Sequence, residues 1–223
     1  ARDMPIEGRE LDGIHLALDY LGEVTRALLE GRDATIDAAG KDVVVIGGGD
    51  TGVDCVACAL RQGAKSVRQV IRADEGSASW PGPRAAYTQG YGQREAEELL
   101  GNDPRIWSTD TIAFVGNGAV EAVCIQDLAY DGGRHLVEET QREIPAQLVL
   151  IAKGFLGADD ALFEAFGVMR ASDADELHGL RAVGDAIVPV YVAGDARMGS
   201  TLVATAIADG LACADEVCAA LRL

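Results

Sequence analysis

The stretch Val43-Val44-Val45-Ile46-Gly47-Gly48-Gly49-Asp50-Thr51-Gly52 decides the fold of this 223-residue chain. Its four consecutive apolar residues are typical of a strand buried on both faces, as in a parallel sheet covered by helices. The glycines that follow satisfy the pattern G-x-G-x-x-G at Gly47, Gly49 and Gly52. Because the pattern directly follows the strand and opens a helix, it predicts a dinucleotide-binding turn.

Each glycine of this turn has a physical role in such a site. Gly47 permits the tight turn, Gly49 lets a pyrophosphate approach the backbone, and Gly52 lets the helix lie close to the strand. The amino terminus of the helix presents backbone amides and the positive end of the helix dipole to the phosphates. The predicted cofactor-binding set is therefore Gly47, Gly48, Gly49, Asp50, Thr51 and Gly52. The structural alternative is a glycine-rich turn that holds no ligand.

The residues around the turn predict an α/β protein with a Rossmann-like dinucleotide-binding domain. A helix over 50–62 and a second strand over 66–72 would complete one βαβ unit. Gly116-Asn117-Gly118 separates two strand-like segments and predicts an antiparallel hairpin or meander beside the parallel sheet. The other expected elements are a helix over 14–30, a loop over 74–92, a helix over 94–100, strands over 106–115, 120–128, 148–152 and 190–193, a helical and then irregular stretch over 157–182, and a helix over 202–221.

The end of the second strand indicates which nicotinamide coenzyme is bound. NAD sites usually place Asp or Glu about 20 residues after the turn, where it binds the ribose hydroxyls. This chain has Arg72 there, with Arg68 four residues earlier. An arginine pairs well with a 2′-phosphate, so the sequence favours NADPH over NADH. In the alternative, Arg72 is a solvated strand end and Asp74 binds the ribose.

The composition argues against several classes of partner. A formal net charge of -17 without a basic cluster opposes binding to nucleic acid or to anionic lipid. No apolar run approaches the about 20 residues of a membrane-spanning helix. The five cysteines are an odd number without a secretory signal, so we expect a cytoplasmic location. The three histidines are scattered, and no metal site is predicted.

The chain offers no clear catalytic side chain. A Tyr-x-x-x-Lys pair is absent and no His–Asp pair can be identified, whereas a flavin acceptor would need neither because its ring takes the hydride. Cys55 and Cys58 match the CxxC pattern of a redox dithiol. Their position inside the helix after the turn favours two small apolar residues on a buried face instead. We therefore assign no catalytic residue and favour a flavoprotein.

Segments along nearly the whole chain share their residues with one known family. They are residues 43–55, Tyr91–Ala96, Asp103–Arg105, Leu148–Gly157, Val192–Asp195 and Gly199–Leu202. Together they resemble the small (beta) subunit of NADPH-dependent glutamate synthase and its relatives among two-dinucleotide flavoproteins. The resemblance implies that electrons pass from NADPH to FAD, then through iron–sulfur clusters to a large subunit that makes glutamate.

The resemblance also implies a division of the chain and a second group of site residues. Residues 1–12 would be a lead segment from an FAD domain, 13–154 the NADPH-binding domain, and 155–223 a C-terminal segment of the FAD domain. Gly154 would lie at the crossing between the two domains. In the last segment, Asp195 would bind the ribityl chain of the flavin beside Gly194, and the amides of Thr201 and Leu202 would face the flavin ring.

Departures from the family pattern limit what the chain is expected to do alone. The family's N-terminal region, with its cluster-ligating cysteines and its own glycine motif for FAD, is missing here, and Met198 and Ser200 stand where arginine and glutamine are expected. We therefore expect a C-terminal fragment that exposes apolar surface, holds FAD weakly or not at all, and is inactive as glutamate synthase. Its expected partners are that N-terminal region and a large subunit, with a homodimer left open. The alternative is a non-catalytic nucleotide-binding or subunit-docking module.

Overall fold

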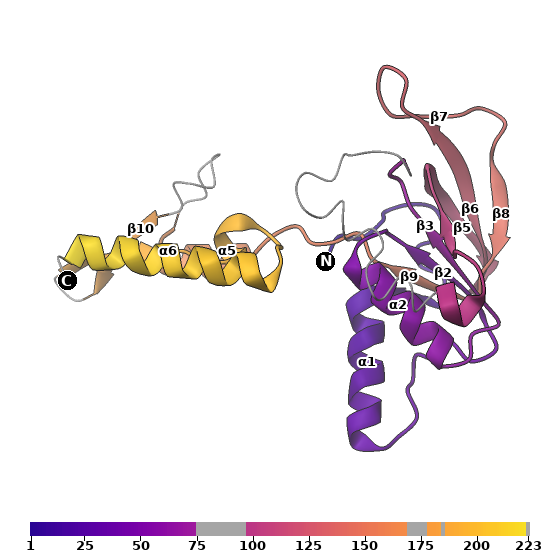
Figure 1. The fold of residues 1–223 in the computed structure, drawn as a ribbon, viewed down its shortest axis with the longest axis horizontal. Helices are drawn as coiled ribbons and strands as arrows, with labels where there is room; N and C mark the ends of the chain where they lie inside the picture. Colours follow the sequence, from indigo (N-terminus) through magenta and orange to yellow (C-terminus); the bar gives the residue numbers. More distant parts are fainter. Residues whose placement is uncertain (75–96, 169–177, 184–185, 222–223) are drawn as a thin grey trace. The chain divides into compact units, whose positions relative to one another are not determined.

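The computed structural model describes residues 1–74, 97–168, 178–183 and 186–221 (Figure 1). The chain divides into two compact units, Ala1–Gly154 and Phe155–Leu223. Each unit has its own strands and its own helices, so each is described by itself.

The first unit is built on a five-stranded parallel sheet with the order β1-β9-β2-β3-β4. The strands are β1 (Ile14–Leu16), β2 (Asp42–Ile46), β3 (Ser66–Val70), β4 (Arg105–Ile106) and β9 (Leu148–Ile151). The helices α1 (Ala17–Glu30) and α2 (Asp50–Arg61) follow β1 and β2 in the chain. The glycine turn therefore joins a central strand of the sheet to α2.

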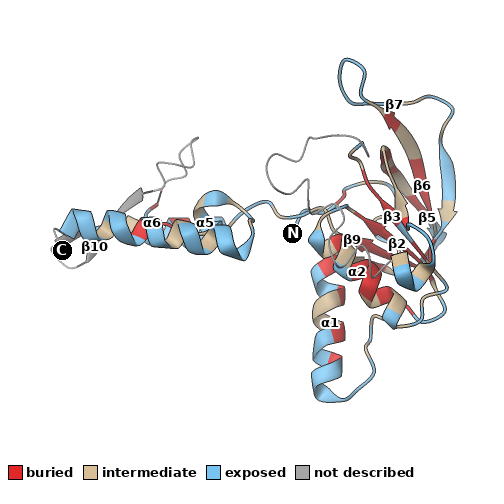
Figure 2. Cartoon of the chain, in the orientation of Figure 1, coloured by how far each residue is buried: buried red, intermediate tan, exposed pale blue. Residues whose placement is uncertain are grey.

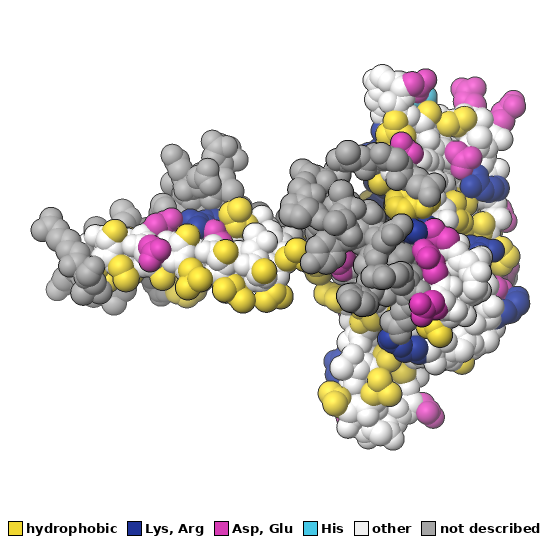
Figure 3. All heavy atoms as spheres, in the orientation of Figure 1, with side chains coloured by type: hydrophobic (Ala, Val, Ile, Leu, Met, Phe, Trp, Pro, Cys, Tyr) yellow, Lys and Arg dark blue, Asp and Glu magenta, His cyan; other side chains and the backbone are white. Residues whose placement is uncertain are grey.

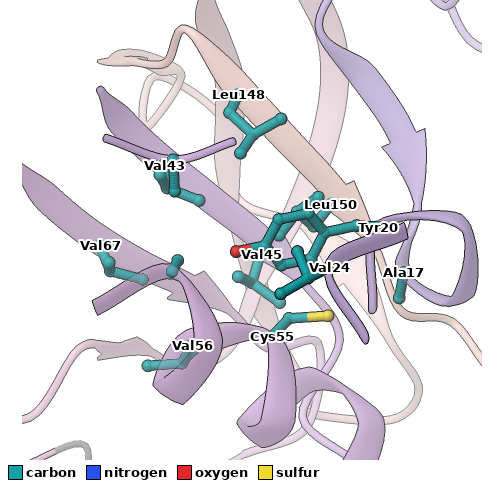
Figure 4. Close-up of a cluster of buried hydrophobic side chains, with 12 residues drawn as sticks. Ala17, Tyr20, Val24, Val43, Val45, Cys55, Val56, Val67, Leu148 and Leu150 are labelled. Carbon is teal, nitrogen blue, oxygen red and sulfur yellow. The ribbon is translucent and has the colours of Figure 1, made fainter. Parts of the chain in front are cut away.

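Alternate residues of β2 and β9 face two separate cores. On the helix side, Val43, Val45, Leu148 and Leu150 pack with residues of α1 and α2, among them Tyr20 (Figure 4). On the other side, residues such as Val44, Ile46, Val149 and Ile151 pack with the antiparallel strands. Because both faces are covered, these strands are wholly buried (Figure 2). Their unbroken apolar runs follow from that burial.

The antiparallel sheet covers the second face of the parallel sheet. It contains β5 (Thr109–Asn117), β6 (Ala119–Ala129), β7 (His135–Leu136) and β8 (Arg142–Pro145), with β6 paired to the other three. Gly118 joins β5 to β6 at a φ of 77°. The first residues of the chain pack here as well, because the Phe114 amide donates to the Glu7 carbonyl and Met4 is buried in this core.

The second unit is smaller and has less buried surface. Its elements are α4 (Asp160–Phe166), the antiparallel pair β10 (His178–Val183) and β11 (Ala186–Tyr191), the short helix α5 (Asp195–Met198) and the long helix α6 (Val203–Leu221). Among its described residues the apolar cluster is limited to Phe163, Val168 and Val192, with Ala158 and Val190 against it.

The predicted fold class is confirmed: parallel strands with helices and an antiparallel meander make an α/β protein. Several element boundaries were predicted wrongly, and two of these errors concern strands that were missed. The helix expected over 14–30 begins at Ala17, because Ile14–Leu16 pair with β9 as a strand. The stretch expected to be irregular through 182 contains β10, which pairs with β11. The loop expected over 74–92 lies outside the described residues except for its first residue, Asp74. Of the helix expected over 94–100, residues 97–100 are described and are helical.

The core beneath α1 and α2 predicts a large loss of stability when it is truncated. Leu150 is fully buried there, so Leu150→Ala should lower the free energy of unfolding of the first unit by about 2–5 kcal/mol. Leu29 on α1 is 82% exposed, and Leu29→Ala should change it by less than about 0.5 kcal/mol. Urea unfolding followed by circular dichroism measures both values. Equal losses in the two variants would contradict the assigned core.

Candidate dinucleotide-binding site

The predicted nucleotide site lies at the carboxyl end of the parallel sheet. Strands β2, β3 and β9 run in the same direction, so the residues that follow them gather along one edge. These residues are the glycine turn after β2, Ile71 and Arg72 after β3, and Ala152–Gly154 after β9. In open α/β sheets, ligands bind at this edge.

The turn is closed tightly by two of its glycines. Gly47 has a φ of 127°, and a Cβ there would lie 2.2 Å from the Ala152 carbonyl oxygen. A Cβ at Gly52 would lie 2.4 Å from the Gly47 carbonyl oxygen. Any side chain at either position would therefore push apart β2, β9 and the start of α2.

Gly49 has the opposite environment. It is the N-cap of α2, and a Cβ placed there would meet none of the described residues within 4 Å. Packing among the described residues does not require a glycine here, whereas a ligand that approaches the backbone closely does. The open space lies at the amino terminus of a 12-residue helix, where amides favour an anion. This backbone cradle fits the pyrophosphate of a dinucleotide. Gly48, Asp50 and Thr51 complete the predicted set, and Asp50 is exposed in the first turn of α2.

Arg72 is held by a carboxylate that the sequence did not point to. Its Nη2 lies 2.7 Å from Oδ2 of Asp110 on β5, and its side chain is 39% exposed. Its Nε is buried and has no hydrogen-bond partner among the described residues. Toward the described residues, the guanidinium therefore uses only part of its hydrogen-bonding capacity.

A second cation lies near Arg72. Lys153 follows β9, is half-buried, and has its pKa lowered chiefly by burial and next by the charge of Arg72. The two side chains thus place positive charge at this edge of a chain whose formal net charge is -17. Sequence reasoning missed Lys153, although its place directly after a fully apolar strand marks the same edge of the sheet.

Sequence reasoning also missed Gln69 on β3. Its side chain is 1% exposed, and its Nε2 donates to the Gly47 carbonyl oxygen at 2.9 Å. The sequence feature that could have identified Gln69 is a polar residue at an inward-facing position of the strand, between the buried Val67 and Val70.

The residues predicted for the flavin lie together in the second unit. The Asp195 carboxylate accepts hydrogen bonds from the Thr201 amide at 3.1 Å and from its hydroxyl at 2.8 Å. The Gly194 amide donates to Asp209 at 2.6 Å, and Leu202 is 40% exposed at the start of α6. One loop therefore gathers the predicted group, but the Thr201 amide is already bonded to Asp195. Gly154 is the last residue of the first unit, with a φ of 79°.

The CxxC pair does not form an accessible dithiol. Cys55 is fully buried in the core under α1, where burial raises its thiol pKa to about 12 (Figure 4). Cys58 is half-buried one turn later. Within the described ranges, no three His, Cys, Asp or Glu side chains come together in a way that could bind a metal ion. No helix in that part of the chain is long and apolar enough to cross a bilayer.

Solved structures that resemble the fold include one named as an oxidoreductase and one named as a thioredoxin reductase. FprA of Mycobacterium tuberculosis in complex with NADPH matches with a TM-score of 0.59 at 18% identity, over 99% of this chain and 61% of FprA. Thioredoxin reductase of T. acidophilum matches with a TM-score of 0.57 at 19% identity, over 94% of this chain and 59% of the reductase. At these identities the likeness shows the fold.

Curated relatives match the sequence much more closely, while no protein-family model matches the chain. The glutamate synthase [NADPH] small chain of Bacillus subtilis is 40% identical over 236 residues, which are 97% of this chain and 47% of that protein. The Mycobacterium tuberculosis small chain is 38% identical over 97% of this chain and 46% of its own length. Glutamate synthase [NADH] of Schizosaccharomyces pombe is 34% identical over 97% of this chain and 11% of its length. The chain is therefore a homologue, along nearly its whole length, of a region that makes up about half of the NADPH-dependent glutamate synthase small chain.

Proposed function

We propose that this chain binds NADPH at the glycine turn and serves as the NADPH-binding part of a flavin-dependent oxidoreductase resembling the glutamate synthase small chain. The observation that carries the proposal is the backbone cradle at Gly49, which the described residues leave open at the start of α2, with Arg72 just after the neighbouring strand β3. NADPH would supply a hydride, and FAD would accept it in the complete protein.

The choice of NADPH rests on the charges beside the cradle. Curated relatives are named for either NADPH or NADH, so kinship alone does not decide the coenzyme. Arg72 and Lys153 bring positive charge to the end of β3, where the 2′-phosphate would lie. A guanidinium has five N–H donors, so Arg72 can keep its bond to Asp110 and still bind a phosphate.

Replacing Arg72 should therefore separate the two coenzymes. Arg72→Ala should weaken NADPH binding by about tenfold or more, the usual value of a lost charge-assisted hydrogen bond, and leave NADH binding unchanged. Titration calorimetry with both coenzymes measures the effect.

Two variants at neighbouring positions control this experiment. Arg68→Ala removes the same charge from an exposed position on β3 and should have a much smaller effect. Asp110→Asn removes the carboxylate that shares Arg72 and should strengthen NADPH binding. Equal losses for NADPH and NADH in Arg72→Ala would contradict the 2′-phosphate assignment.

The second unit supports the flavin half of the proposal. Residues 155–223 would form part of an FAD domain, with 1–12 leading in from it and 13–154 binding NADPH. Hydrophobic side chains line an exposed face of α6, at Val203, Ile207 and Leu211 (Figure 3). We propose that the other part of the FAD domain covers this face, since the chain spans about half the length of the small chains that it matches. The same proposal includes a large glutamate synthase subunit as a partner of the complete protein and a cytoplasmic location for it.

The fit of this unit to FAD predicts weak binding. The Thr201 amide, which would face the flavin ring, is held by Asp195, and the apolar face of α6 is open. The purified chain, mixed with FAD and desalted, should therefore keep no flavin absorption and should not pass electrons from NADPH to an artificial acceptor. A retained flavin band would contradict this prediction. The second candidate, a non-catalytic nucleotide-binding or subunit-docking module, predicts no electron transfer even in a protein extended to the length of its relatives.

The structure argues against a disulfide reductase that uses Cys55 and Cys58. A thiol reacts as its thiolate, and burial holds the Cys55 pKa at about 12. Iodoacetamide at neutral pH should therefore leave Cys55 unmodified in the folded chain, while the exposed Cys218 reacts. Peptide mass spectrometry measures both sites. Labelling of Cys55 as fast as Cys218 would restore the dithiol hypothesis.

A further inference from the structure

Gln69 is an unusual residue for the inside of this sheet. It lies on β3, 1% exposed, between the buried Val67 and Val70. Its neighbours in the sheet are the wholly buried strand β2 on one side and β4 on the other. Packing alone would be served better there by an apolar side chain of similar size.

The amide of Gln69 lies where the first and last glycines of the turn meet. Its Nε2 donates to the Gly47 carbonyl oxygen at 2.9 Å. A Cβ at Gly52 would lie 3.0 Å from the same Nε2. The Gly47 amide donates to the Val70 carbonyl at 3.0 Å, so both the N–H and the C=O of Gly47 are held from β3.

The other end of the Gln69 amide points to a role beyond packing. Its Oε1 is buried and has no hydrogen-bond partner among the described residues. Burying an acceptor without a partner is costly, so natural cores rarely keep one without a reason. Methionine would fill similar volume without that cost, which implies that the bond from Nε2 to Gly47 is what the position provides.

We propose that Gln69 is a positioning residue for the pyrophosphate of the dinucleotide. By holding the Gly47 carbonyl, it fixes the orientation of the turn and so aims the first amides of α2 at the phosphates. The inference rests on the proposed function, because it needs a dinucleotide at the turn. It adds Gln69, a residue outside the glycine pattern, to the residues that determine the affinity of the turn for the dinucleotide.

The test compares two glutamines in the same domain. Gln69→Met removes the bond to Gly47, whereas Gln62→Met removes two bonds at the far end of α2, where Gln62 Oε1 accepts from the Tyr20 hydroxyl at 2.6 Å and from the Ala38 amide at 3.0 Å. Both variants should lower the melting temperature. Gln69→Met should also weaken NADPH binding by about tenfold or more, and Gln62→Met should leave it within about twofold of the original chain.

A third variant adds a pH-dependent readout, taken under conditions in which circular dichroism shows the variant folded at both pH values. Gln69→Glu puts a carboxyl group in the same volume. When protonated it can donate to the Gly47 carbonyl, and when ionised it cannot and repels that oxygen. Burial raises the pKa of a carboxyl, so the protonated form should persist in mildly acidic solution. Relative to the original chain at each pH, NADPH affinity should be nearly restored at pH 5.5 and lost at pH 8.5.

Each outcome decides between the two proposals. If the original chain does not bind NADPH, the proposed function itself fails. If it binds and Gln69→Met binds equally well, or is weakened no more than Gln62→Met, Gln69 has only a structural role and the inference is overturned. A Gln69→Glu affinity that follows the original chain at both pH values also overturns it.

Discussion

The fold of the first unit depends on the contact between Gly47 and Gly52. A Cβ at Gly52 would lie 2.4 Å from the Gly47 carbonyl, and a Cβ at Gly47 would lie 2.2 Å from the carbonyl of Ala152. Both positions are glycines and have no Cβ. Only for that reason can the end of β2 lie this close to the start of α2 and to the end of β9. The same approach brings the amino terminus of α2 to the edge where a phosphate can reach it. One steric constraint therefore sets both the packing of the domain and the position of the proposed phosphate site.

What could be predicted from the sequence is what depends on local pattern. The apolar runs of β2 and β9 and the Gly116–Gly118 turn indicated the two sheets, and the spacing of three glycines indicated the cradle. Pairing across the chain was not predictable in the same way. Leu16 fits the helical spacing of the apolar residues that follow it, but Ile14–Leu16 form a strand because they pair with β9. Gln69 bonds to Gly47, and Asp110 pairs with Arg72. Each contact joins residues far apart in the sequence, so no local pattern predicts it.

The charges beside the glycine turn differ in sign from the net charge of the chain. With a formal net charge of -17, the overall field repels a phosphate, so binding depends on groups within a few ångströms. The helix start supplies backbone amides, and Arg72 and Lys153 supply positive charge beside them. Asp110 moderates that charge by pairing with Arg72. Such an arrangement keeps a cation ordered at the edge of the sheet before a ligand arrives.

The two units differ in how completely they bury their own apolar residues. This difference bears on which of the two proposed sites is complete within this chain. In the first unit both faces of the parallel sheet are covered. In the second, the described core is limited to a few side chains around Phe163, while Val203, Ile207 and Leu211 of α6 are 77%, 58% and 65% exposed at four-residue spacing. Residues four apart lie on one face of a helix, so these side chains form a single apolar stripe. Under the proposed function, the complete first unit would bind its nucleotide alone, whereas a flavin site beside an open stripe would need the surface that covers it. This asymmetry supports a protein in which coenzyme recognition is finished within this chain and flavin chemistry is shared with another part.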